Sequence, residues 1–584
     1  MSNVVKWFKS GGVVLTDFKS LTGEEDADEH ETLQDDGSDT TPKTDRGHAA
    51  AAADIPDVYT VEDAVDKMGF GLFQILLSMF AGSIWMVEAF EVMILSILSG
   101  ALKCQWKLSY AQEASITTVV FFGFLVGGTV WGITADKFGR KRTLLVVLIL
   151  GFVFGIASAF SPNYYVILLI RGLVGFGFGG GFLGPAYCAE FLPARSRAVI
   201  MCLLEIAWAV GSVVEALLAL VVMTSIDHEP WRWLLGFSAL PVLLVILVFP
   251  LIPESPRYLI FKGQEEKAKK VLSLIAKVNC KQLPDGRLVT AEEKEKLLKE
   301  RSPLPDEITV STTTMLDDEA ETKEISGTLP NMDSNDLTVI SSDNDSDSEL
   351  LLDEHTQRRK QIINKLVNYY HWILILFKNG WWRTTLLLWY LWFAANIIYY
   401  GGTLLTTSLF QHDEHCGLKG NDSDVDCKVL TKSDYIHIVW TTCAEFPGTA
   451  WIIVLLLLIG RKKSMAITTL AAAIFYGLLF LCLDKVVLTV FLFGVRGFAT
   501  GFFQAIYLYT PEVYPTAVRA FGMSLCASIS RVGGMITPYI AQTLLAYSSV
   551  ATISLFIVFS LSSSVASLLL PIETRGRPMK DTGG

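Results

Sequence analysis

The chain has 584 residues, of which 51% are hydrophobic, and its mean hydropathy is +0.42. A soluble protein of this length would be more polar, and many apolar stretches reach the roughly 20 residues that a helix needs to cross a bilayer. The formal net charge of −11 is concentrated in residues 24–39 and 306–354, outside the apolar stretches, and no basic surface points to a nucleic-acid partner.

The first half of the chain begins with a polar, acidic segment. Residues 1–60 are expected to be a disordered cytoplasmic N-terminus. They contain no secretory signal, so we expect the first membrane helix to direct insertion. A short amphipathic helix is predicted at 61–70, and an N-terminal six-helix bundle is predicted over 61–252. Its spans are expected near residues 75–98, 115–135, 143–161, 164–187, 198–223 and 234–252.

A long polar segment, residues 253–380, follows as a cytoplasmic loop. Residues 264–279 have the spacing of an amphipathic helix, whereas 304–357 are acidic, lack an apolar period and are expected to be disordered. Asp347, Leu351 and Leu352 fit an acidic dileucine signal, which would bind sorting adaptors. The alternative is a solvated linker in which this match is accidental.

The second half repeats the pattern of apolar stretches. Six more spans are expected near residues 383–410, 435–459, 464–483, 486–509, 521–547 and 550–571, in a C-terminal bundle over 381–577 with a cytoplasmic tail at 578–584. The predicted fold is therefore an all-α membrane protein with twelve transmembrane helices in two pseudo-symmetric six-helix bundles.

Three motifs occur once in each half and in the same order. Gly139-Arg140-Lys141 of the first half repeats as Gly460-Arg461-Lys462 in the second. Glu190-x-x-Pro193-x-x-x-Arg197 repeats as Glu512-x-x-Pro515-x-x-x-Arg519. Pro253-Glu254-Ser-Pro-Arg257 repeats as Pro571-Ile-Glu573-Thr-Arg575. An Arg-Gly pair, at Arg171 and at Arg496, precedes the second motif in each half. Repeats of this kind in membrane proteins are typical of transporters with a site between the halves.

Orientation follows from the short basic loops. The clusters after the second, fourth, eighth and tenth spans fall on one side, which is predicted to be cytoplasmic together with both termini. The loop at 411–434 then faces the opposite compartment, where Asn421 is a glycosylation candidate and Cys416 and Cys427 are a candidate disulfide. Cys104 in the first loop on that side is an alternative disulfide partner.

Gly132-Ile-Thr-Ala-Asp136-Lys-Phe-Gly139-Arg140-Lys141-Arg142 resembles the signature loop of the major facilitator superfamily, and the repeated motifs resemble its sugar-porter and organic-ion branch. A finer resemblance, carried by Tyr399-Tyr400-Gly, Glu445-Phe-Pro-Gly and Tyr509-Thr-Pro-Glu-Val-Tyr-Pro, is to the synaptic vesicle 2-related group. The second half departs from the signature, since Leu457 stands where an acid would precede Gly460. This departure predicts a weaker cytoplasmic latch in the second half.

Charged residues inside the spans are costly, so each needs a partner or a watery cavity. Glu88 and Glu91 lie three residues apart on one helical face, where a carboxylate pair suits proton coupling; the alternative is a static ion pair with Arg171. Glu205, Glu445 and Arg531 are further candidates for contact with a substrate or a coupling ion. Arg171 and Arg496 repeat between the halves, which favours a structural role.

Polar-tipped aromatic residues mark the seventh span. Asn396, Tyr399 and Tyr400 are candidates for contact with an amphipathic organic ligand, with Gln504 and Tyr507 as secondary candidates. A separate set near the cytoplasmic ends is predicted to act as a gate whose ion pairs form and break between the two halves. It comprises Asp136, Arg140, Glu190, Arg197, Glu254, Arg257, Glu512, Arg519, Glu573 and Arg575.

The sequence therefore predicts a secondary transporter that moves a small organic solute across the bilayer by alternating access with proton coupling. An intracellular vesicle membrane is the expected location. Two alternatives remain open at this point, namely a transporter-like receptor without flux and a sugar porter. No ATP-binding loop, catalytic constellation, metal site or cofactor is expected.

Overall fold

The computed structural model describes residues 58–291, 293, 294, 296, 297, 376, 377, 381–411, 428–481, 484–514 and 516–575. The predictions for Asn421, Cys416, Cys427 and the dileucine residues Asp347, Leu351 and Leu352 lie outside these residues. So do the predicted disorder of 304–357 and of residues up to 57, and the tail at 578–584. For the last three residues of the predicted disordered segment 1–60 the prediction is wrong, because Val58 and Tyr59 form a short strand and Thr60 caps the helix that follows. The chain divides into a membrane unit, residues 1–290 and 380–584, and a second unit, residues 291–379, of which only a few residues are described.

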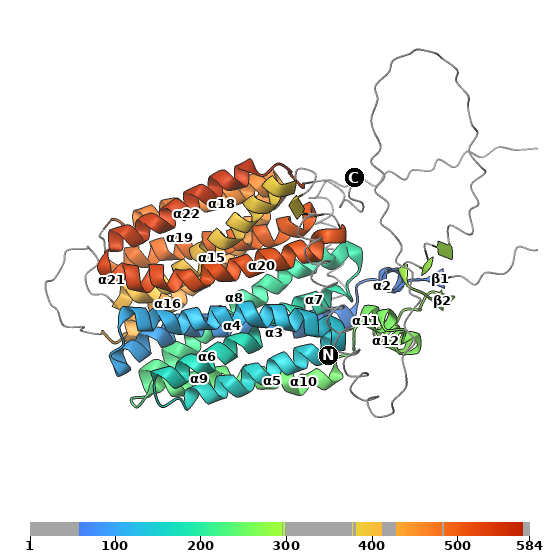
Figure 1. The fold of residues 1–584 in the computed structure, drawn as a ribbon, viewed down its shortest axis with the longest axis horizontal. Helices are drawn as coiled ribbons and strands as arrows, with labels where there is room; N and C mark the ends of the chain where they lie inside the picture. The colour runs from blue at the N-terminus through green and yellow to red at the C-terminus, as the bar shows by residue number, and fades with distance from the viewer. Residues whose placement is uncertain are drawn as a thin grey trace, which may run out of the picture. The chain divides into compact units, whose positions relative to one another are not determined.

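The first half of the membrane unit consists of apolar helices that follow one another closely (Figure 1). Capping side chains set where several of them begin. Ser109 accepts a hydrogen bond from the amide of Gln112 at the start of the second span, and Asn163 does the same for Val166 at the start of the fourth. The helices are α3 (Leu72–Trp106), α4 (Tyr110–Phe138), α5 (Arg140–Ala159), α6 (Tyr164–Phe178) with α7 (Leu183–Ala189), α8 (Ala194–Ser225), and α9 (Pro230–Ser238) with α10 (Leu240–Val248) and the short 3₁₀ helix η1 (Phe249–Leu251).

The second half has the same number of helical spans. They are α15 (Trp381–Gln411), α16 (Lys432–Cys443) with α17 (Glu445–Ile459), α18 (Arg461–Leu478), α19 (Lys485–Val513), α20 (Thr516–Pro538) with the π-helical η2 (Tyr539–Leu544) and α21 (Leu545–Tyr547), and α22 (Ser549–Leu569). Each of the twelve predicted spans thus overlaps a helix or a run of helices.

Nine of these spans are long and apolar enough to cross a bilayer within the part of the chain that the structure describes. The other three contain α15, α18 and α20. Their hydropathy is lower because α15 is rich in Trp, Tyr and Thr, while α18 and α20 carry Lys or Arg.

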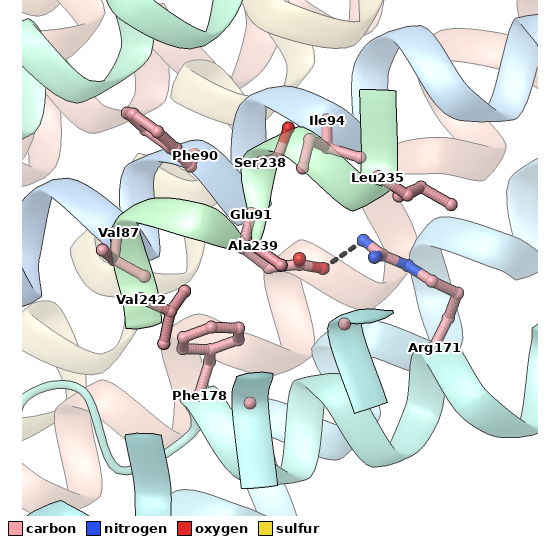
Figure 2. Close-up of a pocket in the computed structure, with 12 residues that line it drawn as sticks. Val87, Phe90, Glu91, Ile94, Arg171, Phe178, Leu235, Ser238, Ala239 and Val242 are labelled. Carbon is pink, nitrogen blue, oxygen red and sulfur yellow. Dashed lines mark hydrogen bonds and ion pairs between the residues drawn. The ribbon is translucent and has the colours of Figure 1, made fainter. Parts of the chain in front are cut away.

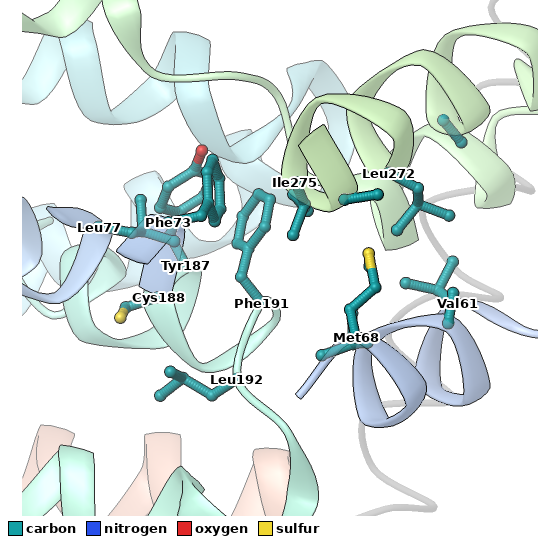
Figure 3. Packing of buried hydrophobic residues seen from close by; sticks show 14 of the residues in the cluster. Val61, Met68, Phe73, Leu77, Tyr187, Cys188, Phe191, Leu192, Leu272 and Ile275 are labelled. Atoms are coloured by element: carbon teal, nitrogen blue, oxygen red, sulfur yellow. The ribbon is translucent and has the colours of Figure 1, made fainter. Parts of the chain in front are cut away.

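A small non-membrane layer packs at one end of the first half. It contains α2 (Val61–Met68), α11 (Pro256–Phe261), α12 (Glu265–Val278) and a parallel two-stranded sheet of β1 (Val58–Tyr59) and β2 (Arg287–Leu288), with Val58 opposite Arg287. Met68, Leu272 and Ile275 from this layer pack in one cluster with Phe73 of α3 and Phe191 of the turn between α7 and α8 (Figure 3). The end of the protein where this layer and the two Gly-Arg-Lys turns lie is called the basic-loop face below.

The two halves contact each other toward the opposite face. Gln542 donates to the hydroxyl of Ser99 at 2.8 Å, and Thr543 donates to the carbonyl of Tyr110 at 3.1 Å. Near these contacts Cys104 is disulfide-bonded, and its sulfur lies 3.8 Å from the carbonyl oxygen of Lys428 in the second half. Cys104, the alternative disulfide partner of the sequence analysis, therefore takes part in a disulfide on this face.

Candidate functional site

A narrow cavity of about 30 Å³ lies between the two halves. Space of this size holds water only, so the halves must separate before the cavity can take an organic solute. The first half contributes residues from α3 and α8, and the second half contributes residues from α15, α19 and α20. The lining residues are Trp85, Glu88, Glu205, Trp208, Tyr399, Tyr400, Thr500, Phe503, Gln504, Tyr507 and Arg531.

One ion pair crosses the cavity from half to half. Glu88 Oε1 lies 3.3 Å from an Arg531 guanidinium nitrogen, and the Arg531 guanidinium also stacks 4.8 Å from the centre of the Phe124 ring. Gly181 makes room for this pair, since a Cβ at that position would lie 2.2 Å from Glu88 Oε2. One alternative predicted from the sequence was that an acid of α3 pairs with Arg171. Glu88 is not that acid, because it pairs with Arg531 of the other half.

Glu205 differs from Glu88 in having no cationic partner among the residues that the structure describes. It is partly exposed to the cavity beside Trp85, and Trp208 follows it by one helical turn on α8. Neither tryptophan was predicted from the sequence to be a site residue. The spacing could have indicated them, because Trp85 is three residues from Glu88 and Trp208 is three residues from Glu205, so each shares a helical face with a site carboxylate.

Aromatic rings form most of the remaining wall. Trp85 and Trp208 lie 5.3 Å apart, Tyr399 and Tyr400 lie 5.1 Å apart, and Phe503 lies 5.3 Å from Tyr507, measured between ring centres. The structure therefore brings Tyr399 and Tyr400 to the cavity, together with the secondary candidates Gln504 and Tyr507. Asn396 is placed elsewhere: it is fully buried and donates to Ser530, beside Arg531, so it positions α20 instead of lining the cavity.

A second buried ion pair lies inside the first half, away from the inter-half cavity. Glu91 accepts a hydrogen bond from Arg171, and both side chains are almost completely buried (Figure 2). A small pocket beside them is lined by Phe90, Phe178 and Ser238 among others. Glu215, also buried, accepts a hydrogen bond from Ser238 at 2.8 Å. The structure thus confirms a partner for Arg171, and that partner is Glu91.

A third pair occupies the second half. Glu445 Oε1 lies 2.9 Å and 3.0 Å from two nitrogens of Arg496, and it also accepts a hydrogen bond from the hydroxyl of Tyr399 at 2.9 Å. Arg496 also contacts the first half, because its Nη2 atom lies 3.5 Å from the sulfur of Met93. Three arginines, Arg171, Arg496 and Arg531, therefore converge on residues 88–93 of α3.

The predicted gate residues form two equivalent clusters at the basic-loop face, one in each half, which we call the clasps. Within the described residues their contacts join parts of the same half, so the structure does not place these ion pairs across the two halves. The first clasp comprises Asp136, Arg140, Glu190, Arg197, Glu254 and Arg257, and the second comprises Arg461, Glu512, Arg519, Glu573 and Arg575.

The two clasps repeat the same hydrogen bonds. Glu254 accepts from the amide of Lys141 at 2.9 Å, and Glu573 accepts from that of Lys462 at 3.1 Å, each at the start of a helix where a negative charge is favoured. The preceding glycines, Gly139 and Gly460, have φ of 105° and 85°, and a Cβ on either would meet the glutamate. This is a physical reason for glycine in both basic loops.

The central arginine of each clasp is bound differently. Arg140 divides its contacts between Asp136, at 3.0 Å, and Glu190, at 3.2 Å. Arg461 instead holds Glu512 with two nitrogens, at 2.8 Å and 3.0 Å. The second half, although it lacks the acid before Gly460, thus has the bidentate geometry that makes arginine–carboxylate pairs strong. This geometry gives no support to the predicted weaker latch in that half.

Two further clasp arginines and one acid have distinct surroundings. Arg197 donates to the carbonyl of Leu192 at 3.2 Å, and Arg519 donates to that of Tyr514 at 3.3 Å, each five residues earlier in the chain.

Burial raises the pKa of Glu190 above the ordinary carboxyl value, although a hydrogen bond from Ser255 and the charge of Arg140 oppose the shift.

Residues 85–317 and 427–582 match the family model of the sugar (and other) transporters. The chain belongs to this transporter family. Among curated proteins it is 37% identical over 594 residues to the synaptic vesicle 2-related protein of Xenopus laevis, covering 99% of this chain and 93% of the relative. It is 35% identical over 527 residues to organic cation/carnitine transporter 7 of Arabidopsis thaliana, covering 90% and 96%.

Solved structures confirm the fold. The inward open conformation of the xylose transporter XylE from E. coli superimposes with a TM-score of 0.58 at 14% identity, covering 87% of this chain and 98% of XylE. This similarity and the twelve helical spans confirm the predicted all-α membrane protein of the major facilitator superfamily. The resemblance to the synaptic vesicle 2-related group is confirmed by the curated relatives.

Proposed function

We propose that this multi-pass membrane transporter moves small organic cations by alternating access through the cavity between its halves. The observation that carries the proposal is the charge of that cavity. Glu88 and Arg531 neutralise each other, while Glu205 has no cationic partner among the described residues, so the lining bears one net negative charge whenever Glu205 is ionised. A monocation would restore neutrality, and its charge would offset the cost of leaving Glu205 away from bulk water.

The aromatic wall supports the same class of substrate. Rings of Trp85, Trp208, Tyr399 and Tyr507 surround the space next to Glu205, and aromatic faces attract ammonium groups. Neutral hydrogen-bonding groups that a sugar would use are also present, namely Gln504, Thr500, the tyrosine hydroxyls and the indole nitrogens. The name of organic cation/carnitine transporter 7, a relative over most of the chain, agrees with this choice.

Proton coupling would use the Glu91–Arg171 pair. Both side chains are buried away from the inter-half cavity, with the small pocket of Figure 2 beside them. When Glu91 carries a proton its charge is lost and its hold on Arg171 weakens, which would change how α3 packs on α6. A substrate in the cavity touches the same helix through Trp85 and Glu88. The position of α3 would therefore depend both on protonation of Glu91 and on binding of the substrate.

The orientation and location follow from the basic loops and the relatives. With the basic-loop face in the cytoplasm, as positive residues favour, the inter-half contacts near Ser99 and Tyr110 would close the lumenal side. The clasps would then face the cytoplasm together with both termini. A vesicle membrane is the proposed location, in keeping with the synaptic vesicle 2-related relatives.

The experiment is uptake by purified protein in proteoliposomes with an imposed pH gradient. The probe is benzyltrimethylammonium, which is aromatic and permanently charged; D-xylose and benzoate serve as neutral and anionic comparisons. We expect saturable, pH-driven flux of the cation alone, with the pH drive weakened in Glu91→Gln. Xylose flux without cation flux would replace the proposal with a sugar porter. Tight cation binding with no flux of any probe would favour a receptor.

A further inference from the structure

The acid–arginine pair of the second half is not explained by chain duplication alone. Arg496 repeats Arg171 as part of the Arg-Gly pair of each half, and both arginines are buried. Their acids come from different places, because Glu91 lies in the first span of its half whereas Glu445 lies in the second span of its half. The arginine therefore repeats between the halves, whereas the carboxylate opposite it does not.

Glu445 occupies a break in its span. Helix α16 ends at Cys443 and α17 begins at Glu445, so this carboxylate sits in the first turn of a helix inside the membrane. The chain approaches α19 very closely here, since a Cβ on Gly448 would lie 2.2 Å from the carbonyl oxygen of Gly497. Close packing holds Glu445 against Arg496 at this irregular point, where the single residue Ala444 separates the two helices and still bonds to the carbonyl of Thr441.

A hydrogen-bonded relay connects this pair to the cavity. The indole nitrogen of Trp208 donates to the hydroxyl of Tyr399 at 2.8 Å, and that hydroxyl donates to Glu445 at 2.9 Å. Trp208 belongs to the first half and Tyr399 to the second, and both rings line the cavity. A substrate that enters between these rings must lengthen the Trp208–Tyr399 contact and so alter the hydrogen bonding of Glu445.

We propose that Glu445 is a second proton-coupling carboxylate, paired with Arg496 and linked to the substrate cavity through the positioning residue Tyr399, so that each transport cycle moves two protons. This inference rests on the proposed function. In the step itself, an O–H bond forms on the Glu445 carboxylate with a proton from water on one side of the membrane. The same bond breaks on the other side, and Arg496 keeps its charge throughout.

The groups around Glu445 are consistent with a titrating site. Arg496 from α19 and Tyr399 from α15 contact it directly, Ser212 of α8 and Cys443 of α16 lie beside it, and Glu205 acts at longer range. When Glu445 is protonated, Arg496 retains the sulfur of Met93 as a contact. The positive charge released in this way lies next to the inter-half boundary, where it would favour separation of the halves.

The test is the proton-to-substrate ratio, measured as the pH gradient that stops net benzyltrimethylammonium flux against a tenfold gradient, with the membrane potential clamped at zero. A tenfold concentration gradient and a difference of one pH unit store equal free energy. The pH difference at which net flux stops, called the null, is therefore about half a pH unit for two protons per cycle and about one pH unit for one proton. We expect about half a unit for the wild type and about one unit for Glu445→Gln. Glu229→Gln, which changes a surface carboxylate outside the cavity and the relay, should keep the wild-type null.

Tyr399→Phe tests the relay without removing a charge, which matters if Glu445→Gln does not fold. It keeps the ring and deletes only the hydroxyl, so we expect the cation KM to change less than about threefold while the null moves toward one unit. A wild-type null at one unit, or an unchanged null in Tyr399→Phe, would overturn the inference and leave the proposed function standing. Absence of saturable cation flux in the wild type would overturn both.

Discussion

Glu88 of the first half and Arg531 of the second half form an ion pair, 3.3 Å apart, in the wall of the central cavity. Around it, the polar contacts between the halves lie at the level of the cavity or toward the face opposite the basic loops. Any movement that opens the cavity to that opposite face must break this pair. Glu88 and Arg531 are therefore the charged contact that most directly connects the contents of the cavity with the relative position of the halves.

Gly181→Ala should abolish most transport while the protein still folds. The added Cβ would lie 2.2 Å from Glu88 Oε2 and would push the carboxylate away from Arg531. Overpacking of this kind costs about 1–3 kcal/mol, so we expect at least about a fivefold loss of cation flux at equal expression. Gly236→Ala is the matched control, because no atom lies within 4 Å of its added Cβ. Equal flux in the two variants would remove Gly181 and Glu88 from the mechanism.

Glu205→Gln should weaken cation binding. The substitution keeps the shape of the side chain but removes the one cavity carboxylate that lacks a cationic partner among the described residues. Loss of one partner of a desolvated charge pair costs about 2 kcal/mol or more, so the KM for benzyltrimethylammonium should rise about 30-fold. Glu229→Gln, at a surface pair with Arg232, should leave the KM unchanged. A rise in KM for both variants would indicate a general rather than a local effect.

Arg171→Gln should destabilise the protein strongly. It leaves the buried carboxylate of Glu91 without its cation, and breaking a buried pair in this way costs about 3–5 kcal/mol. The double variant Glu91→Gln with Arg171→Gln should recover most of the loss, since no charge then remains buried. Melting temperature in detergent is the measurement. A double variant as unstable as the single one would mean that Arg171 stabilises the fold through packing instead of charge.

Replacing the central clasp arginines by lysine should affect the second half more. Arg461→Lys gives up a bidentate contact with Glu512, whereas Arg140→Lys can keep a single contact with either of its two acids. We expect Arg461→Lys to lower the free energy of unfolding by about 1–2 kcal/mol more than Arg140→Lys, from thermal melts of the purified variants. A larger loss in Arg140→Lys would restore the expectation that the acid before Gly139 makes the first clasp the stronger one.

Glu190 gives the first clasp a dependence on pH. Burial raises the pKa of this carboxyl above its ordinary value of 4.5, so between that value and the folded pKa the folded protein binds more protons than the unfolded chain. Stability contributed by this group therefore falls as pH rises through the window. Glu190→Gln should flatten this part of the pH profile of the melting temperature. A variant profile parallel to that of the wild type would contradict the shift.

The sequence predicted the twelve spans well because apolar runs and repeated motifs are local signals. The short helix at 61–70 and the amphipathic helix at 264–279 were predicted for the same reason, and α2 and α12 occupy those positions. Cavity residues with charge or an adjacent motif, such as Glu205 and Tyr399, were also found. A charged or polar side chain is costly inside a membrane, so its presence in an apolar span pointed to a functional position.

The sequence did not predict which charges meet. Glu88 and Glu91 looked equivalent, and only the packing of α3 against three other helices sends one to Arg531 and the other to Arg171. Trp85 and Trp208 were missed because a tryptophan in an apolar span has the composition of ordinary core or interface. Asn396 was placed with the ligand, but its amide contacts Ser530 because α15 and α20 pack closely at Gly533.

The convergence of three arginines on α3 also bears on how the chain is made. Residues 87–100 of this helix are all buried in the finished protein, yet it leaves the ribosome before the other spans that the structure describes. Arg171, which pairs with Glu91, is 80 residues downstream, and Arg531, which pairs with Glu88, is 443 residues downstream. The Glu88 carboxylate must therefore remain protonated, hydrated or shielded by the insertion machinery until the eleventh span has been synthesised.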